Sequence, residues 1–293
     1  MDPSQKILII GAGYLGQRIA HFACASGWSV FAARRQPPMD PGLDPISWLS
    51  IDVTSADSVR ECLHKASSKQ QLAAAVYCVS AGEPNENAYK RAYEIGVRNI
   101  IEHLPTETQL AFISSTGVYH QNSGESVDES SPTNPLLLSK TQSHLLTGES
   151  LVINRPNSVI ARLSGIYGPG RTRLISMAQA MNDPYIVDRQ DYTNRIHVDD
   201  GARAVLHLLK NQSSEKIYCV TDHEPAPQLD VVMWIRSAMA MPPIQVRYRQ
   251  QDTFVTTPDQ LPSFNKRISN QRLLNSGFKF HFPTFREGYG KLL

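Results

Sequence analysis

The stretch that decides the fold is Lys6-Ile7-Leu8-Ile9-Ile10, followed directly by Gly11-Ala12-Gly13-Tyr14-Leu15-Gly16. Its four consecutive aliphatic residues predict a strand that is buried on both faces, as in a parallel sheet. A helical pattern of apolar residues then begins at Leu15. The glycines have G-x-G-x-x-G spacing between the strand and the helix, which is typical of a dinucleotide-binding turn.

Each residue of this turn has an expected physical role. Gly11 allows the tight turn, Gly13 lets the backbone approach a diphosphate, and Gly16 allows close packing of helix and strand. The backbone N–H groups of Tyr14 and Leu15 lie at the start of the helix, where the unpaired amides and the helix dipole favour an anion. We therefore predict that the segment from Gly11 to Gly16 binds a dinucleotide.

Composition excludes several classes of protein. The chain has 293 residues, of which 41% are hydrophobic and 19% charged, with a net charge of +2. No basic stripe suggests a nucleic-acid surface, and no apolar run is long enough to predict a membrane span. The four cysteines and nine histidines are dispersed without metal-ligand spacing, so no metal site is predicted. We expect a cytoplasmic protein.

Strand and helix patterns alternate through the first half of the chain and predict an α/β fold with a doubly wound, mainly parallel sheet, the Rossmann arrangement. We place the dinucleotide-binding domain at residues 1–163. Residues 164–293 have a looser pattern and are expected to form a smaller α/β substrate domain, interleaved with the first. Within it, residues 198–221 are expected to return to the main sheet.

Polar residues at the predicted strand ends extend the candidate cofactor site. Arg34 and Arg35 follow the second strand, and Arg34 lies 23 residues after Gly11. Basic residues there can accommodate a 2′-phosphate, which favours NADP over NAD, although a solvated loop arginine would have the same sequence. Asp52 and Val53 follow the third strand and could contact the adenine. A further pair, Ser80-Ala81, follows the fourth strand and suits a backbone against the cofactor, or a simple turn.

Further along, Ser114-Ser115-Thr116-Gly117-Val118-Tyr119, Ser139-Lys140, the RLSGIYGPG segment ending at Gly170 and the RIHVDD segment beginning at Arg195 occur in order. With the opening glycine stretch, they make nearly the whole chain similar to the extended short-chain dehydrogenases, the NAD(P)-dependent nucleotide-sugar epimerase and dehydratase family. The resemblance implies catalytic Ser, Tyr and Lys residues, with the Tyr four positions before the Lys. Ser115 and Lys140 match, and Lys140 would also contact the nicotinamide ribose.

The implied tyrosine is absent, because Leu136 stands four residues before Lys140. A leucine cannot transfer a proton, so another group substitutes, the chemistry differs, or the protein does not turn over. The pattern resembles the atypical branch of the extended family. Tyr119, expected to face the substrate pocket, could replace the missing group, as could a water, His120 or Lys140. Each candidate also has an ordinary structural reading.

The resemblance also implies substrate contacts in the second half. Tyr167 would line the substrate pocket, and Arg171 and Arg195 would hold a substrate diphosphate, although both arginines could be simple surface residues. Relatives in this family form homodimers through two helices that this chain can also form, but the same apolar positions suit a monomer, so the oligomeric state is left open.

Two functions are therefore compared. The first is an NADP(H)-dependent epimerase, dehydratase or reductase that acts by hydride transfer on a small hydroxyl or carbonyl substrate, such as a nucleotide sugar. The second is a non-catalytic NADP-binding sensor or scaffold, which the leucine at position 136 favours.

Overall fold

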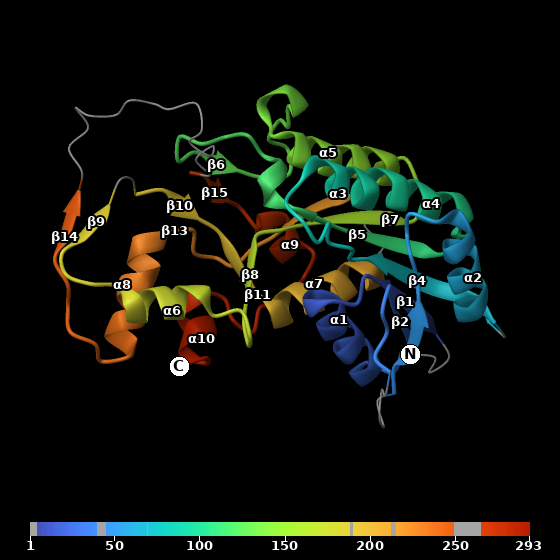
Figure 1. The fold of residues 1–293 in the computed structure, drawn as a ribbon, viewed down its shortest axis with the longest axis horizontal. Coiled ribbons are helices and arrows are strands. Elements are labelled where there is room, and N and C mark those ends of the chain that lie inside the picture. The colour runs from blue at the N-terminus through green and yellow to red at the C-terminus, as the bar shows by residue number, and fades with distance from the viewer. Residues whose placement is uncertain (1–4, 40–44, 69, 188–189, 212–214, 249–264) are drawn as a thin grey trace.

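The computed structural model describes residues 5–39, 45–68, 70–187, 190–211, 215–248 and 265–293. These residues contain a seven-stranded parallel sheet in the order β12-β7-β5-β4-β1-β2-β3 (Figure 1). The chain order reverses beside β1, so the loops after β1 and β4 diverge and leave a crevice at the carboxyl ends of the strands. The strands are β1 (Lys6–Ile10), β2 (Ser29–Arg34), β3 (Ser47–Ser50), β4 (Leu72–Tyr77), β5 (Gln109–Ser115), β7 (Ser158–Leu163) and β12 (Ile217–Val220).

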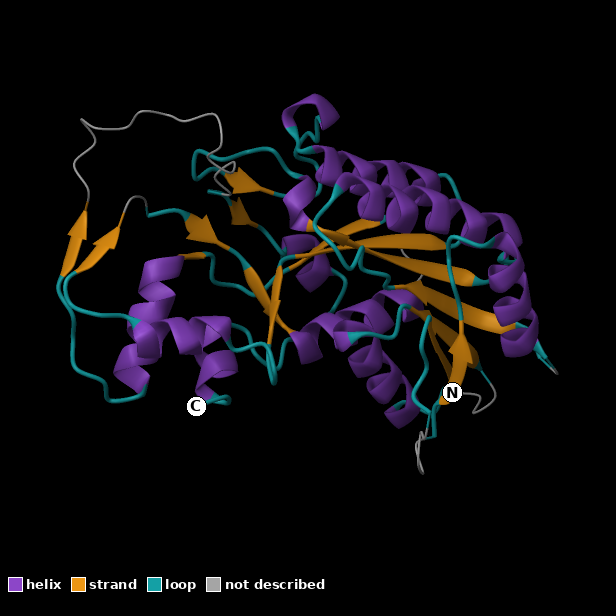
Figure 2. Cartoon of the chain, viewed as in Figure 1, coloured by secondary structure: helices purple, strands orange, loops and turns teal. Residues whose placement is uncertain are grey.

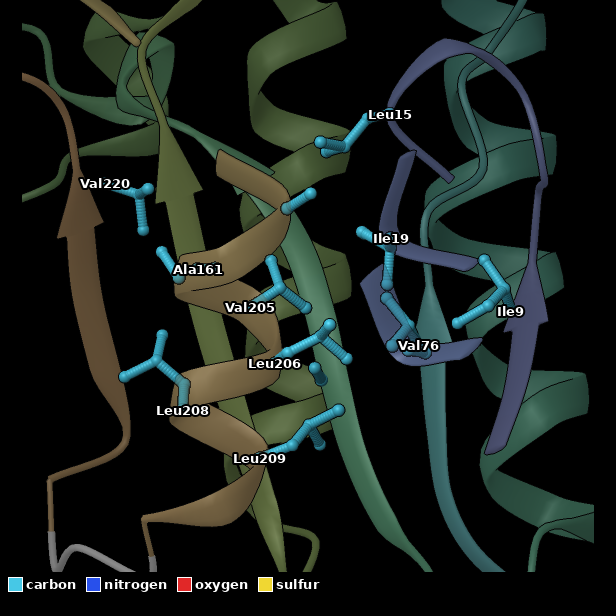
Figure 3. Packing of buried hydrophobic residues seen from close by; sticks show 14 of the residues in the cluster. Ile9, Leu15, Ile19, Val76, Ala161, Val205, Leu206, Leu208, Leu209 and Val220 are labelled. Carbon is cyan, nitrogen blue, oxygen red and sulfur yellow. The ribbon is translucent and has the colours of Figure 1, made fainter. Parts of the chain in front are cut away.

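Helices cover both faces of this sheet (Figure 2). Successive β1 side chains point to opposite faces, so Ile7 and Ile9 pack with one layer of helices, whereas Leu8 and Ile10 pack with the other. The first layer comprises α1 (Tyr14–Ala25) and α7 (Val198–Lys210). In Figure 3 the labelled α7 side chains lie by Ala161 of β7, and Ile19 of α1 lies by Val76 of β4 and Ile9 of β1. The second layer comprises α2 (Ala56–Ser67), α3 (Glu86–Lys90), α4 (Gly96–His103) and α5 (Lys140–Ile153).

The helical segment over residues 86–103 is interrupted. A π-helical turn, Arg91–Ile95, connects α3 to α4. The Gly96 N–H donates to the Arg91 carbonyl, five residues back, instead of to Ala92. The Ala92 carbonyl instead accepts a hydrogen bond from the Tyr77 hydroxyl. The interruption is therefore stabilised by a buried side chain from β4.

The second part of the chain has its own small core around Tyr167, Val231, Ile235 and Phe285. In Figure 1 it lies beside the carboxyl-terminal edge of the main sheet. Its helices are α6 (Arg173–Ala180), α8 (Gln228–Ala238) and α10 (Phe285–Gly290), and α9 (Gln271–Asn275) packs near β12. Its short strand pairs are β8 (Gly165–Tyr167) with β11 (Arg195–His197), β9 (Tyr185–Val187) with β14 (Val246–Tyr248), and β10 (Tyr192–Thr193) with β13 (Ala226–Pro227). A fourth pair joins β6 (Ser126–Val127) to β15 (Arg267–Ile268).

The α/β fold with its doubly wound parallel sheet is confirmed. The two parts are interleaved, because α7 and β12 return to the main sheet between segments of the smaller core. The division at residue 163 stays a prediction. No helix within the described ranges has the length and apolar character needed to cross a membrane.

Candidate functional site

A cavity of about 1090 Å³ lies at the carboxyl ends of β1, β2, β4 and β5. Parallel sheets of this type bind ligands at this position. The lining includes these predicted residues: Gly11, Gly13, Tyr14, Leu15, Gly16, Arg34, Arg35, Asp52, Val53, Ser80, Ala81, Ser115 and Arg171. The structure thus brings these residues into one cavity, and what they bind stays a prediction.

The three glycines of the opening turn have different surroundings. Gly11 has a φ of +89°, and a Cβ on it would lie 2.6 Å from the Val79 nitrogen. A Cβ on Gly16 would lie 2.7 Å from the Gly11 oxygen. In contrast, a Cβ on Gly13 would have nothing closer than the Gly11 oxygen at 4.0 Å. Gly11 and Gly16 are therefore required by packing, whereas Gly13 leaves open space over the backbone.

The start of α1 is suited to an anion. Its N-cap is Gly13, which has no side chain to accept a hydrogen bond from the first turn, and that turn contains no acidic residue. The amides of Tyr14 and Leu15 lie at this end, where the helix dipole is positive. A phosphate in the cavity would supply the acceptor that the sequence lacks.

Positive charge gathers at the end of the cavity beneath β2 and β3. Arg34, Arg35 and Arg91 all line it. The Arg34 guanidinium lies 5.3 Å from the centre of the Trp48 ring, and its Nε donates to the Gln36 carbonyl at 2.7 Å. Asp52 contributes a carboxylate whose pKa is lowered by hydrogen bonds from Thr54. This end can therefore bind a group that carries both hydrogen-bond donors and negative charge.

Arg171 comes from the loop after β8 and reaches the opening glycine turn. Its guanidinium lies 4.3 Å from the centre of the Tyr14 ring, and the Tyr14 hydroxyl donates to the Pro169 carbonyl at 2.9 Å. The loop after β8 thus contacts the start of α1 through the Tyr14 side chain. Arg171 thus lies beside the predicted cofactor turn, and its contact with a substrate diphosphate stays a prediction.

Ser115 ends β5 inside the cavity. Its Oγ accepts a hydrogen bond from the Gly117 N–H at 3.0 Å, which fixes the side chain and leaves its hydroxyl proton available to a ligand. Cys78 lines the same cavity close to Gly11, and burial raises the pKa of its thiol to about 12. A thiol with this pKa is protonated at neutral pH and is a poor nucleophile.

Lys140 and Leu136 lie outside the cavity lining. Lys140 is the first residue of α5, its side chain is 78% exposed, and its Nζ pairs with Glu86 at 3.0 Å. Leu136 is 91% exposed in a short 3₁₀ turn that precedes the helix. The expected contact of Lys140 with a nicotinamide ribose therefore has no support in this arrangement.

The structure places three other predicted site residues away from the cavity lining. Tyr119 does not face the pocket: it is 1% exposed, and its hydroxyl accepts a hydrogen bond from Arg162 at 2.8 Å. Burial raises its pKa further above the usual range. Arg195 is 4% exposed and donates to backbone carbonyls such as that of Ala226 instead of meeting a ligand. Tyr167 is also buried and stacks on Tyr289 with ring centres 4.3 Å apart. All three are residues of protein cores.

Sequence reasoning missed a buried polar network beneath the cavity. Glu149 on α5 pairs with Arg162 on β7, with Nη2 and Oε2 2.6 Å apart, and accepts a hydrogen bond from Ser114. The Arg162 Nη1 donates onward to Tyr119. Both members of the ion pair have side chains that are 5% exposed. The network therefore links the cavity wall at Ser114 to the core around Tyr119.

It also missed two cavity residues on one helical segment, Arg91 and Tyr93. Both belong to the π-helical turn, which alters the direction of side chains relative to an α-helix. The only sequence signal was Gly96 within a helical pattern, since a glycine there indicates close packing. Indeed, a Cβ on Gly96 would lie 2.4 Å from the Tyr77 hydroxyl.

Comparison with known proteins places this geometry in a family. The chain is 26% identical to Protein YeeZ of Escherichia coli K12 over 290 residues, which cover 95% of this chain and 97% of that protein. A solved structure of a candidate NAD-dependent epimerase/dehydratase from Methylobacillus flagellatus is 33% identical, covers 98% of this chain and 97% of its own, and has a TM-score of 0.76. The dTDP-glucose 4,6-dehydratase of Bacillus anthracis, solved with NAD, shares the fold at 14% identity, with coverage of 98% and 95% and a TM-score of 0.77.

The model of the NAD-dependent epimerase/dehydratase family matches residues 7–220. That segment begins in β1 and ends with the last residue of β12, so it spans the glycine turn and all seven strands of the main sheet. The chain therefore belongs to the NAD-dependent epimerase/dehydratase family.

Proposed function

We propose that the protein binds NADP(H) in this cavity and acts on a small hydroxyl or carbonyl substrate, such as a nucleotide sugar, by hydride transfer. One observation carries the proposal: the uncapped start of α1, the cluster of arginines and Ser115 all line the same cavity. The residues present fit a dinucleotide, because Gly13 leaves open space over the backbone and the first turn of α1 lacks an acceptor. Once bound, such a coenzyme supplies or accepts a hydride.

In this proposal the chain's own residues bind the coenzyme and orient the substrate. The backbone from Gly11 to Gly16 holds the diphosphate, and Arg171 adds a positive charge beside it. Asp52 accepts hydrogen bonds from the adenine, and Ser80 and Ala81 lie along the ribose. Ser115 holds the reacting oxygen of the substrate through its free hydroxyl proton.

The preference for NADP over NAD rests on charge. Arg34 and Arg35 lie at the end of β2, where a carboxylate would be needed to bind an unphosphorylated ribose. Arg91 adds a third cation on the same side of the cavity. A 2′-phosphate there would gain charge-assisted hydrogen bonds, which are about twice as strong as neutral ones.

The activity is tested by incubating the protein with NADPH and a panel of nucleotide sugars, aldehydes and ketones, and by following the absorbance of the reduced ring. Ser115→Ala should lower turnover by about 10²-fold or more, in line with the loss of one oxyanion donor, while coenzyme affinity stays unchanged. Ser143→Ala, at a half-buried serine of α5 outside the cavity lining, is the matched control. Unchanged turnover in Ser115→Ala would remove Ser115 from the reaction.

A second function is favoured by a specific observation. The position that normally carries the catalytic phenol is a solvent-exposed leucine, and the lysine that should accompany it pairs with Glu86. A coenzyme-binding sensor or scaffold needs neither group. Tight binding of NADPH without consumption by any member of the panel would support this alternative.

A further inference from the structure

Tyr93 presents a phenol to the cavity from an unexpected element. It lies in the π-helical turn between α3 and α4 and lines the cavity together with Ser80 and Ala81. Its ring meets Phe112 edge to face with centres 6.4 Å apart. Phe112 lies on β5, three residues before Ser115, so Tyr93 sits at the β4–β5 part of the cavity.

The turn that positions Tyr93 is held by neighbouring elements. The Tyr77 hydroxyl donates a hydrogen bond to the Ala92 carbonyl, which the π-helical turn leaves without a helical partner. Gly96 has no side chain and so leaves room for this hydroxyl. On the other side, a Cβ on Gly148 would lie 2.6 Å from the Tyr93 carbonyl oxygen, so α5 packs closely against the turn. Such single-turn π-helical insertions are frequent at functional sites. The direction of the Tyr93 side chain is therefore fixed by packing on both sides.

Three other proton-carrying groups on the described part of the cavity wall have partners or lie against the glycine turn. The Tyr14 hydroxyl donates to Pro169, and the Tyr14 ring is covered by Arg171. Cys78 lies against the glycine turn, and burial raises the pKa of its thiol to about 12. Ser114 donates to the buried Glu149. Tyr93 combines a phenol with a place on the wall of the cavity that Ser115 also lines.

We propose that Tyr93 is the proton donor of the reaction, in place of the phenol that is absent at position 136. This inference rests on the proposed function. When a carbonyl is reduced, its carbon gains a hydride from the reduced nicotinamide, which is oxidised. The π electron pair of the carbonyl then takes the proton from the Tyr93 hydroxyl. The phenol O–H bond breaks, its electron pair stays on the phenol oxygen, and solvent water restores the proton.

The surroundings of Tyr93 suit this direction of transfer. Burial raises the pKa of the phenol above its ordinary value, and Tyr89 and Cys78 raise it further. The phenol is therefore protonated at neutral pH and can act as a donor. The backbone N–H of Ala81 acts in the opposite sense, lowering the pKa by hydrogen bonding to the phenol oxygen. It would stabilise the phenolate that remains after transfer, as backbone donors do for other developing oxyanions.

A spectroscopic titration tests this assignment without a substrate. An oxidised nicotinamide ring carries a positive charge, and an opposite charge within a few ångströms lowers a pKa by about 1–3 units. Saturation with NADP⁺ should therefore shift one tyrosinate absorbance transition to lower pH in the wild type. The shift should disappear in Tyr93→Phe and persist in Tyr89→Phe, a matched control because the Tyr89 ring is the neighbour of the Tyr93 ring, tilted by 51° with centres 5.3 Å apart.

Turnover on the panel gives the second measurement. Tyr93→Phe keeps the ring packing and should lower kcat by about 10²–10⁴-fold, with the coenzyme dissociation constant changed less than about twofold. A transition that does not respond to saturating NADP⁺, or one that responds equally in Tyr93→Phe, would overturn the assignment of Tyr93. Failure of the wild type to bind the coenzyme at all would instead overturn the proposed function, so the two failures are distinguishable.

Discussion

Replacing Gly13 with alanine should weaken coenzyme binding without unfolding the protein. A Cβ at this position meets no protein atom closer than 4.0 Å, and the backbone φ is −88°, outside the left-handed region. The added methyl group therefore occupies open space where the diphosphate would approach. If the methyl group displaces the diphosphate and breaks one charge-assisted hydrogen bond, the cost is about 1.5–3 kcal/mol. This corresponds to a dissociation constant that is about 10- to 150-fold larger.

Gly11→Ala is the matched comparison, because it should destabilise the fold, whereas Gly13→Ala should weaken coenzyme binding. Its φ is +89°, and the new Cβ would lie 2.6 Å from the Val79 nitrogen. Left-handed backbone costs about 1–2 kcal/mol for an ordinary residue, and overpacking adds about 1–3 kcal/mol. We expect the free energy of unfolding to fall by about 2–5 kcal/mol.

The two variants are compared by isothermal calorimetry with NADPH and by urea unfolding. Gly13→Ala should lose affinity while its free energy of unfolding changes by less than about 1 kcal/mol. Wild-type affinity in a stably folded Gly13→Ala protein would show that the diphosphate does not lie over this turn. That result would refute the reasoning from the open space above Gly13.

Three further predictions follow from single sites. Arg34→Ser should lower the preference for NADPH over NADH by about tenfold or more. Arg60→Ser, which changes an exposed arginine on α2, should leave this preference unchanged. Equal preferences in the two variants would show that Arg34 does not bind the 2′-phosphate. Glu149→Ala leaves Arg162 buried without its partner and should lower the free energy of unfolding in urea by about 3–5 kcal/mol, so a loss below about 1 kcal/mol would contradict the buried ion pair. Burial raises the pKa of Asp222 to about 7, so the folded state keeps a proton that the unfolded state loses above pH of about 4. The free energy of unfolding should therefore fall as pH rises from about 4 to 7, by about 1.4 kcal/mol per unit relative to Asp222→Asn, and parallel curves would refute this titration.

The fold could be predicted because its signals are local. A strand buried on both faces must be a short aliphatic run, and Lys6–Ile10 is one. The glycine turn after it admits few alternatives, because Gly11 and Gly16 have no room for a Cβ. Alternating strands and helices then determine a parallel sheet with helices on both faces. The gathering of strand-end residues in one cavity follows from that topology.

The positions of individual tyrosines and arginines could not be predicted, because they depend on contacts between distant segments. Tyr119 follows a strand end, but the 3₁₀ turn over residues 116–118 directs it into the core, where Arg162 donates a hydrogen bond to its hydroxyl. Arg195 is similarly enclosed by carbonyls from a segment about thirty residues later. Neither partner is visible in the local pattern.

The π-helical turn explains why Tyr93 escaped notice. Helical periodicity assumes about 3.6 residues per turn, and an insertion of one residue changes which side chains face the sheet. The insertion here depends on the Tyr77 hydroxyl, which comes from a strand fifteen residues earlier in the chain. The sequence therefore indicates a helix over this region but not the direction of Tyr93.

The central claim is that the cavity beside the glycine turn holds a phosphorylated nicotinamide coenzyme. Calorimetric titration of the purified protein with NADPH and NADH, under identical conditions, tests it most directly. We predict saturable binding of NADPH at one site per chain and weaker binding of NADH. Binding of neither coenzyme would contradict the claim, and tighter binding of NADH would contradict the role given to Arg34 and Arg35.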